Sequence, residues 1–287
     1  MDTPKTSIVA YVLAIDSIEE RMKNARDLMD SLESLDVVQE VSLAPAIYWK
    51  EPQKITEFLT RFPEHTFTRK FLRKYRMGQV ATALSHISIW HRLLESKHDA
   101  AVVFEDDIHI SDVIGFRQTM FELRDRQNPE WLRIHLHKRF RDQVLSTRAG
   151  GLFADDPMPW GFATYYVTRS GARKMLECCR QMDGPIDWLP PLLKQRGLMA
   201  TKTVTEVVVE HHDFNGDKSE LSQRHKIEST PDTIQKFSST IWTSPSVSGN
   251  IEMFRFLSRL ARTGESRSGD WGSAYTPKMT IWPFKRN

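Results

Sequence analysis

Short apolar runs alternate with amphipathic stretches along the first two thirds of the chain. Residues 8–13 are apolar and rich in β-branched side chains, and residues 100–104 form a second, fully apolar run. Runs of this length predict strands that are buried on both faces of a sheet. Residues 77–97 carry apolar side chains at helical spacing. Further strands are predicted at 37–43, 132–137, 162–167 and 198–209, and further helices at 16–35, 55–62, 111–126, 170–182 and 189–194.

This alternation of strands and helices is typical of βαβ units. The predicted fold class is therefore α/β, with a mainly parallel central sheet covered by helices. Asp16 and Ser17 are expected to cap the first helix, and Ser111 and Asp112 a later one. From about residue 215 the periodicity fades into polar sequence, and only 251–262 is clearly helical again.

The composition is that of a folded, soluble protein. Hydrophobic residues make up 40% of the 287 residues and charged residues 27%, with a net charge of +3. The apolar run 8–15 is too short to span a membrane, so neither an anchor nor a signal peptide is expected. Cys178 and Cys179 are adjacent, which disfavours a normal disulfide and favours the reducing cytoplasm. The mild charge excess does not suggest nucleic-acid binding.

Three consecutive acids, Glu105, Asp106 and Asp107, follow the apolar run 100–104. In open α/β sheets, ligands bind beyond the carboxyl ends of the strands, where these side chains would project. Oxygen ligands of this kind suit Mg²⁺ or Mn²⁺. The alternative is a solvated acidic turn that precedes the next helix.

Histidines also follow a predicted strand. His211 and His212 come after the valines at 207–209, and would reach the same edge of the sheet if the strands are parallel. An exposed pair at a strand end is the alternative. His135 and His137 alternate along another predicted strand, but they lack cysteines and carboxylates at zinc-ligand spacing.

Two basic runs and one further acid complete the candidate residues. Residues 69–76 and 138–141 are rich in Lys and Arg, and either bind anions or form solvated faces. Asp187 lies between Ile186 and Trp188, and is interpreted either as a catalytic base beside an aromatic sugar platform or as a helix N-cap.

Motif-like segments lie in order along the chain, at 16–21, 77–87, 104–108, 161–172 and 185–187, with a degraded motif at 219–224. Together they resemble glycosyltransferase family 25, which includes bacterial lipopolysaccharide sugar transferases and collagen galactosyltransferases. Gln79 stands where the family usually has Glu, and Thr82 where it has Cys. Residues 132–137 replace a strand that usually ends in Leu-Gly.

The resemblance implies a GT-A-like nucleotide-sugar-binding fold over residues 1–225, followed by a tail at 226–287. It also implies an inverting transfer of a hexose, galactose or glucose, from a UDP-sugar with Mn²⁺ or Mg²⁺. The acceptor would be a lipopolysaccharide, capsule or other glycan, free or lipid-linked. The roles implied for this chain are metal binding by Asp107, Glu105, His211 and His212; catalysis by Asp187 as base; donor binding by Asp16, Arg21, Ser85, His86, Glu105, Asp106 and Arg224; and acceptor stacking by Trp160 and Trp188. For Ser85, His86, Trp160 and Trp188, packing in the core is the alternative.

The tail from residue 251 combines a net charge of +4 with aromatic and aliphatic side chains. Such a helix either lies on an anionic membrane surface or packs on the domain. We therefore expect a cytoplasmic protein whose tail is the segment that would contact the inner membrane surface. A metal-dependent phosphoesterase and a catalytically inactive binding protein of the same fold are the alternatives to a transferase.

Overall fold

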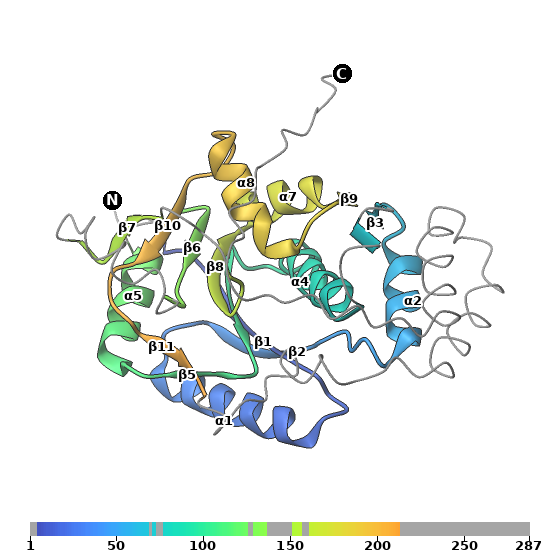
Figure 1. The fold of residues 1–287 in the computed structure, drawn as a ribbon. Coiled ribbons are helices and arrows are strands. Elements are labelled where there is room, and N and C mark those ends of the chain that lie inside the picture. Colours follow the sequence, from blue (N-terminus) through green and yellow to red (C-terminus); the bar gives the residue numbers. More distant parts are fainter. Residues whose placement is uncertain are drawn as a thin grey trace, which may run out of the picture.

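The computed structural model describes residues 5–68, 71–72, 77–125, 129–136, 151–156 and 161–212. A seven-stranded sheet with the order β2-β1-β4-β8-β6-β10-β7 forms its centre (Figure 1). Its strands are β1 (Ile8–Ala14), β2 (Glu40–Pro45), β4 (Ala100–Glu105), β6 (Trp131–Arg133), β7 (Phe153–Asp155), β8 (Thr164–Thr168) and β10 (Thr201–Val204).

Five of these strands run in one direction. β1 pairs in parallel with β2 and β4, and β10 pairs in parallel with β6, whereas β8 is antiparallel to both β4 and β6 and β7 is antiparallel to β10. The sheet is therefore mainly parallel with two reversed strands. This confirms the predicted α/β class with a mainly parallel central sheet, although β8 departs from a simple βαβ series.

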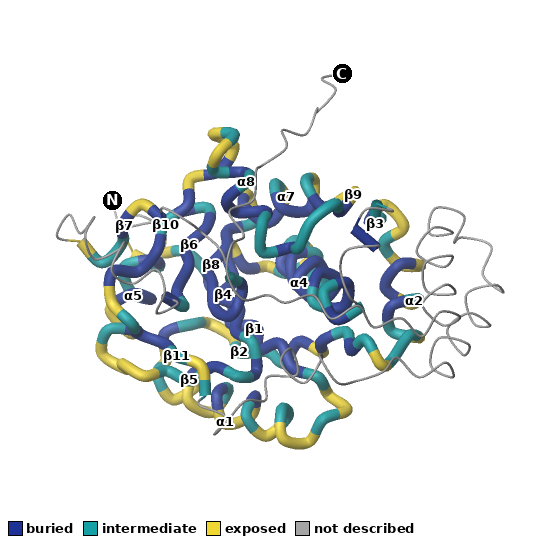
Figure 2. The backbone as a smooth tube through the Cα atoms, in the orientation of Figure 1, coloured by how far each residue is buried: buried dark blue, intermediate teal, exposed yellow. Residues whose placement is uncertain are grey.

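Helices cover both faces of the sheet, and the apolar pattern of the strands explains why. In β1, Val9, Tyr11 and Leu13 belong to one core cluster, and the intervening residues belong to the other. Side chains alternate across a strand, so a fully apolar strand must be buried on both sides. β1 is buried throughout and β4 is buried up to its last residue, at the centre of the fold (Figure 2). The helices are α1 (Glu19–Leu35), α2 (Pro52–Arg61), α4 (Met77–Glu95), α5 (Val113–Asp125), α7 (Arg169–Cys178), α8 (Leu189–Gln195) and the short 3₁₀ helix η1 (Ile186–Trp188).

Each face has its own set of helices (Figure 1). Side chains of α1 and α5 pack in one core cluster, and those of α2, α4, α7 and α8 in the other. No helix in the described ranges is long and apolar enough to cross a membrane.

Two small two-stranded sheets complete the described part. β3 (Thr66–Phe67) pairs with β9 (Gln181–Met182) in parallel, and β5 (Ile108–Ile110) pairs with β11 (Val209–His211) in an antiparallel arrangement. The single strand predicted at 198–209 is wrong, because the chain turns after β10 and β11 leaves the main sheet. The predicted strand at 132–137 also ends earlier, at Arg133.

Helix starts agree with the sequence in one case and differ in another. The Asp112 carboxylate accepts a hydrogen bond from the Gly115 backbone N–H at 3.0 Å, as expected for an N-cap. The predicted cap of α1 is wrong, because Ile18 occupies its N-cap position and no side chain caps it. Asp16 instead forms an ion pair with Lys54.

Candidate active site

The three acids after β4 point to three different partners. Glu105 is the last residue of β4, and Asp106 and Asp107 form the turn to β5. Residues 100–104 of β4 are completely buried, so Glu105 and the turn after it are the first places where the chain presents charge at this edge. A separate polar or cationic group faces each carboxylate, and this offsets the mutual repulsion of the acids.

Asp106 holds the beginning of α1 to the sheet. Its carboxylate forms an ion pair with Arg21, and the Ile15 backbone N–H donates to its other oxygen at 3.4 Å. Burial raises the pKa of Asp106 from 3.8 to about 7, because the loss of hydration outweighs the attraction of Arg21. This carboxylate is directed at the chain itself, and so it acts as a positioning group for the loop after β1.

Asp107 pairs with a histidine of the β5–β11 ribbon. His211 Nδ1 lies 3.5 Å from Asp107 Oδ1, and the His212 backbone N–H donates to the Asp107 carbonyl oxygen at 2.8 Å. Burial acts to raise the pKa of Asp107, but the hydrogen bond and charge of His211 outweigh it, and the pKa is lowered. The same contact raises the pKa of His211. The expected meeting of the histidines with the acids therefore occurs, through the ribbon rather than through a parallel strand.

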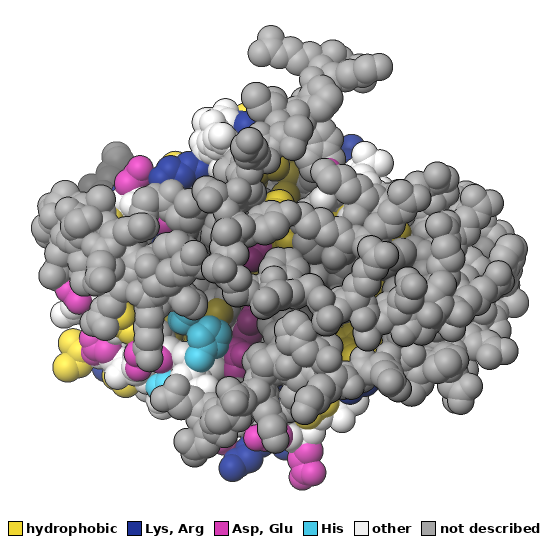
Figure 3. Space-filling model, in the orientation of Figure 1, with side chains coloured by type: hydrophobic (Ala, Val, Ile, Leu, Met, Phe, Trp, Pro, Cys, Tyr) yellow, Lys and Arg dark blue, Asp and Glu magenta, His cyan; other side chains and the backbone are white. Residues whose placement is uncertain are grey.

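Two more histidines join this group. The ring of His135, just beyond β6, lies edge-on to His211 with centroids 4.4 Å apart, and His109 lies 4.9 Å from His212. Figure 3 shows histidine side chains beside acidic ones on this face, over the β5–β11 ribbon. Sequence reasoning considered His135 only with its strand neighbour 137, which lies outside the described residues, and did not single out His109. His135 lies within the predicted strand 132–137, and His109 lies two residues before the predicted helix 111–126. Neither position marks a site by itself.

His86 contacts the Glu105 carboxylate from α4. This fully buried side chain of α4 has Nε2 3.4 Å from Glu105 Oε1 and Nδ1 3.1 Å from the Tyr165 hydroxyl. The neighbouring Ser85 hydroxyl donates to the Ala81 carbonyl and accepts from the Ile47 backbone N–H, both at 2.8 Å. The segment with the most recognisable motif thus ties α4 to the sheet and to the loop after β2.

Asp187 occupies the middle of η1, beyond the carboxyl end of β4. Pro185 is the N-cap residue of η1, so the interpretation of Asp187 as an N-cap is wrong. Burial raises the pKa of Asp187 from 3.8 to about 6, the charge of Glu105 acts in the same direction, and His86 opposes it. These influences put Asp187 within electrostatic reach of the β4 acids.

The other predicted contacts lie at the border of this group or outside the described residues. Asp16 is exposed next to the carboxyl end of β1 and is paired with Lys54. Trp188 is partly buried and packs against Gly184, where an added Cβ would meet its ring at 3.0 Å. Trp160, Arg224, the tail, all of the basic run 138–141 and most of the run 69–76 lie outside the described residues.

The donor set at Asp107 suits a divalent cation. Asp107 Oδ1 is buried, and the His211 imidazole faces it with Nδ1 at 3.5 Å. Carboxylate oxygen and imidazole nitrogen are ordinary ligands of Mn²⁺ and related ions. In the described ranges, no third Asp, Glu, His or Cys ligand atom lies within 4.8 Å of both groups. Mn²⁺ or Mg²⁺ sites of this kind are usually completed by substrate phosphates and water.

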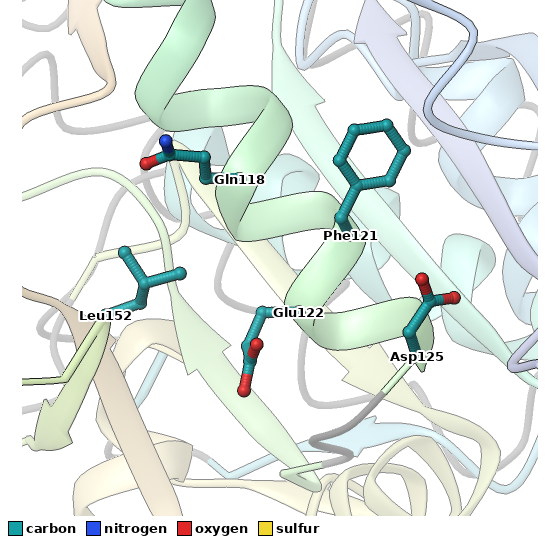
Figure 4. A pocket seen from close by; sticks show the side chains of 5 residues that line it. All are labelled: Gln118, Phe121, Glu122, Asp125 and Leu152. Carbon is teal, nitrogen blue, oxygen red and sulfur yellow. The ribbon is translucent and has the colours of Figure 1, made fainter.

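A separate pocket lies away from these groups. Its volume is about 270 Å³, and its lining comes from the C-terminal half of α5 and the segment before β7 (Figure 4). None of the predicted site residues lines it. The lining side chains are Gln118, Phe121, Glu122, Asp125 and Leu152.

Comparison with known proteins finds similar solved structures and a matching family model. Two crystal structures of glucosyl-3-phosphoglycerate synthase from Mycobacterium tuberculosis are similar, one with Mg²⁺ and UDP and one with Mn²⁺, UDP and glucosyl-3-phosphoglycerate. The first has 13% identity and a TM-score of 0.41 over 83% of this chain and 79% of that chain. The second has 15% identity and a TM-score of 0.41 over 81% and 80%.

No curated protein matches the sequence. The model of glycosyltransferase family 25 (LPS biosynthesis protein) matches residues 8–189, which is more than half of the 287 residues. This match covers β1, the α4 motif, the β4 acids and Asp187. The chain therefore belongs to glycosyltransferase family 25.

Proposed function

We propose that this chain is a metal-dependent, inverting glycosyltransferase. It moves a hexose, galactose or glucose, from a UDP-sugar to a lipopolysaccharide, capsule or other glycan acceptor. Membership of a family described by lipopolysaccharide biosynthesis supports the acceptor class. The observation that carries the proposal is the Asp107–His211 pair at the carboxyl edge of the sheet, and the charge of the adjoining Glu105 acts on Asp187.

Asp107 and His211 are the residues that would hold Mn²⁺ or Mg²⁺, with Glu105 and His212 next to them. A divalent ion bound there would supply Lewis-acid stabilisation of the negative charge that develops on the departing diphosphate. His211 is about half exposed, with 45% of its side chain accessible, whereas Asp107 is more enclosed at 23%. We propose that the diphosphate approaches from the more exposed side, that of His211.

Asp187 is the proposed general base. In a single displacement, the acceptor hydroxyl oxygen forms a bond to the anomeric carbon while the bond from that carbon to the phosphate oxygen breaks. UDP leaves, and the hydroxyl proton passes to the Asp187 carboxylate. A base works best when its pKa lies near the working pH. A carboxyl with a pKa of about 6 is ionised at neutral pH and is a stronger base than an ordinary aspartate.

Other residues position the proposed metal ligands and the proposed base. His86 orients Glu105, and the Arg21–Asp106 ion pair keeps the loop after β1 against the acids, where Asp16 is proposed to border the nucleotide. Trp188 is proposed to stack on the acceptor. Donor contact by Ser85 and Arg224, acceptor stacking by Trp160, and membrane contact by the tail stay predictions.

Nucleotide release from the purified full-length chain tests the proposal. UDP-galactose, UDP-glucose and GDP- and CMP-sugars are offered with Mn²⁺ or Mg²⁺, and free nucleotide is measured. We expect UDP release that EDTA abolishes and that Asp107→Asn reduces by about 100-fold or more. Asp30→Asn, an exposed aspartate on α1, is the matched control.

Three outcomes would contradict the proposal. The first is a chain that neither binds nor hydrolyses any nucleotide-sugar. The second is cleavage of simple phosphate esters with nucleotide-sugars ignored, which would indicate a phosphoesterase. The third is an Asp107→Asn variant with unchanged metal affinity and activity, which would indicate a binding protein that only shares the fold.

A further inference from the structure

A second histidine cluster lies apart from the β4 acids, between the end of α2 and the outer face of α4. Glu64 and His65 belong to the loop that joins α2 to β3, and His91 belongs to α4. The Nε2 atoms of His65 and His91 are 2.9 Å apart, and Glu64 Oε1 lies 3.9 and 4.0 Å from them. None of these residues contributes to the proposed transferase site.

The hydrogen bonding of His65 determines which nitrogen faces the cluster with a lone pair. Its Nδ1 lies 3.1 Å from the Cys179 carbonyl oxygen, and a carbonyl oxygen only accepts, so Nδ1 carries the hydrogen. In the neutral ring, Nε2 is then the unprotonated atom, and it points to His91. An Nδ1–H donated to a backbone carbonyl is the usual support of a histidine that binds metal through Nε2.

Aromatic neighbours pack against both imidazole rings of the cluster. His91 stacks on Phe62 with centroids 3.9 Å apart and an interplanar angle of 15°. His65 is 1% exposed, and Phe58 lies against it at 6.2 Å between centroids. Burial lowers the pKa of both imidazoles.

The surrounding charge permits a cation. Two guanidinium groups act on the histidines, but each is paired with a carboxylate: Arg61 with Glu95 at 3.0 Å and Arg180 with Glu177 at 2.8 Å. Glu64 adds one negative charge to the cluster, and its side chain is 45% exposed.

We propose that Glu64, His65 and His91 bind one Zn²⁺ ion, separately from the transferase site. Tetrahedral ligands at about 2.1 Å from one ion lie roughly 3.4 Å apart. The two imidazoles therefore separate by about 0.5 Å, and the carboxylate approaches by a similar amount. Two imidazoles and a carboxylate form a donor set that zinc favours, and water fills the fourth position.

Such an ion would cross-link two segments of the chain. Glu64 and His65 end the loop before β3, His91 lies on α4, and the carbonyl that orients His65 follows α7. The ion would close the loop of 26 residues between His65 and His91, which stabilises a fold. The competing interpretation is a hydrogen bond from His91 Nε2–H to His65 Nε2 with no metal, and the experiment below decides between the two.

Zinc titration of the full-length chain against a chromogenic chelator tests the proposal, with Co²⁺ absorption as a second readout. His91→Gln retains a side-chain N–H that can donate to His65 but removes the ligand. We expect it to weaken one Zn²⁺ equivalent at least about tenfold. Glu64→Gln, an exposed change with little effect on folding, is expected to weaken the same equivalent and alter the Co²⁺ spectrum.

The controls separate this site from the transferase site. Glu177→Gln, at an exposed acid near the cluster, is expected to bind zinc like the unmodified chain. Asp107→Asn is expected to retain this equivalent whether or not the transferase proposal holds, because the test measures zinc rather than sugar transfer. The proposal is overturned if the unmodified chain binds no Zn²⁺ at this site, or if His91→Gln and Glu64→Gln bind it as tightly as the Glu177→Gln control.

Discussion

Asp187→Asn is expected to remove transfer activity and at the same time stabilise the fold at neutral pH. The folded chain holds this carboxyl in a largely buried position with the negative Glu105 nearby. Its ionised form is therefore less favourable in the folded chain than in the unfolded one. Asparagine has the same size and carries no charge, so it removes this cost. The presence of an acid at position 187 is therefore explained by function rather than by stability.

The magnitude follows from the difference in pKa. A pKa of about 6 in the folded chain against 3.8 in an unfolded one corresponds to about 3 kcal/mol at full ionisation. Hydrogen bonds that the amide cannot reproduce reduce this, so we expect a gain of about 1–3 kcal/mol at pH 7 to 8.

The gain has a defined pH dependence. At pH values below 3.8 the carboxyl is protonated in both states, and the two proteins differ little through this group. Between 3.8 and about 6 the unfolded state loses the proton first, so the unmodified chain loses stability as the pH rises. Above about 6 the penalty is complete, and the difference between the two proteins becomes constant.

Urea unfolding of both proteins between pH 4 and 8 measures this difference, and UDP release measures activity. Loss of a general base typically costs about 100- to 10,000-fold in rate. In the unmodified chain, activity is expected to fall as the pH falls through about 6, because the base becomes protonated. A variant that is less stable at pH 8 than at pH 4, relative to the unmodified chain, would refute the assigned environment. Unchanged transfer would refute the role as base.

Three further changes test the surrounding structure. Arg21→Met leaves Asp106 buried without its cation, so urea unfolding is expected to show a free energy of unfolding lower by about 1–3 kcal/mol. The loss is expected to be smaller at pH 5.5 than at pH 8, because Asp106 takes up a proton near pH 7. An equal loss at both pH values would contradict this. Gly171→Ala places a Cβ against a backbone carbonyl oxygen and is expected to lower the melting temperature. The control is Gly151→Ala, whose Cβ would have its nearest backbone oxygen at 3.9 Å, and it is expected to leave the melting temperature unchanged. His211→Gln is expected to weaken Mn²⁺ binding in the presence of UDP by about 10- to 100-fold, and calorimetry showing no change would exclude it as a ligand.

The elements that the sequence predicts well are those whose pattern is complete within one segment. The runs at 8–13 and 100–104 are apolar at every position, which specifies burial on both faces, and β1 and β4 are such strands. The helical spacing at 77–97 is similarly local, and α4 spans most of it. The motifs there and at 104–108 also carried the family resemblance, which the family match confirms.

Errors concentrate where a segment depends on a distant partner. Nothing local in 162–167 shows that β8 runs antiparallel between β4 and β6, because either direction buries the same apolar residues. Nor does the run 198–209 show that the chain leaves the main sheet and pairs His211 with Ile108 of β5. Strand direction and register depend on hydrogen bonds between segments, and periodicity carries no record of them.

The candidate site shows the same division. The sequence alone determined that Glu105, Asp106 and Asp107 stand at the end of a buried strand. Only the tertiary structure decided that each has a different partner, and that Glu64, His65 and His91 meet across 26 residues of chain. Burial depends on the polarity of each side chain, and so it can be predicted from the sequence one residue at a time. A polar contact between distant segments exists only after packing has fixed their separation and orientation.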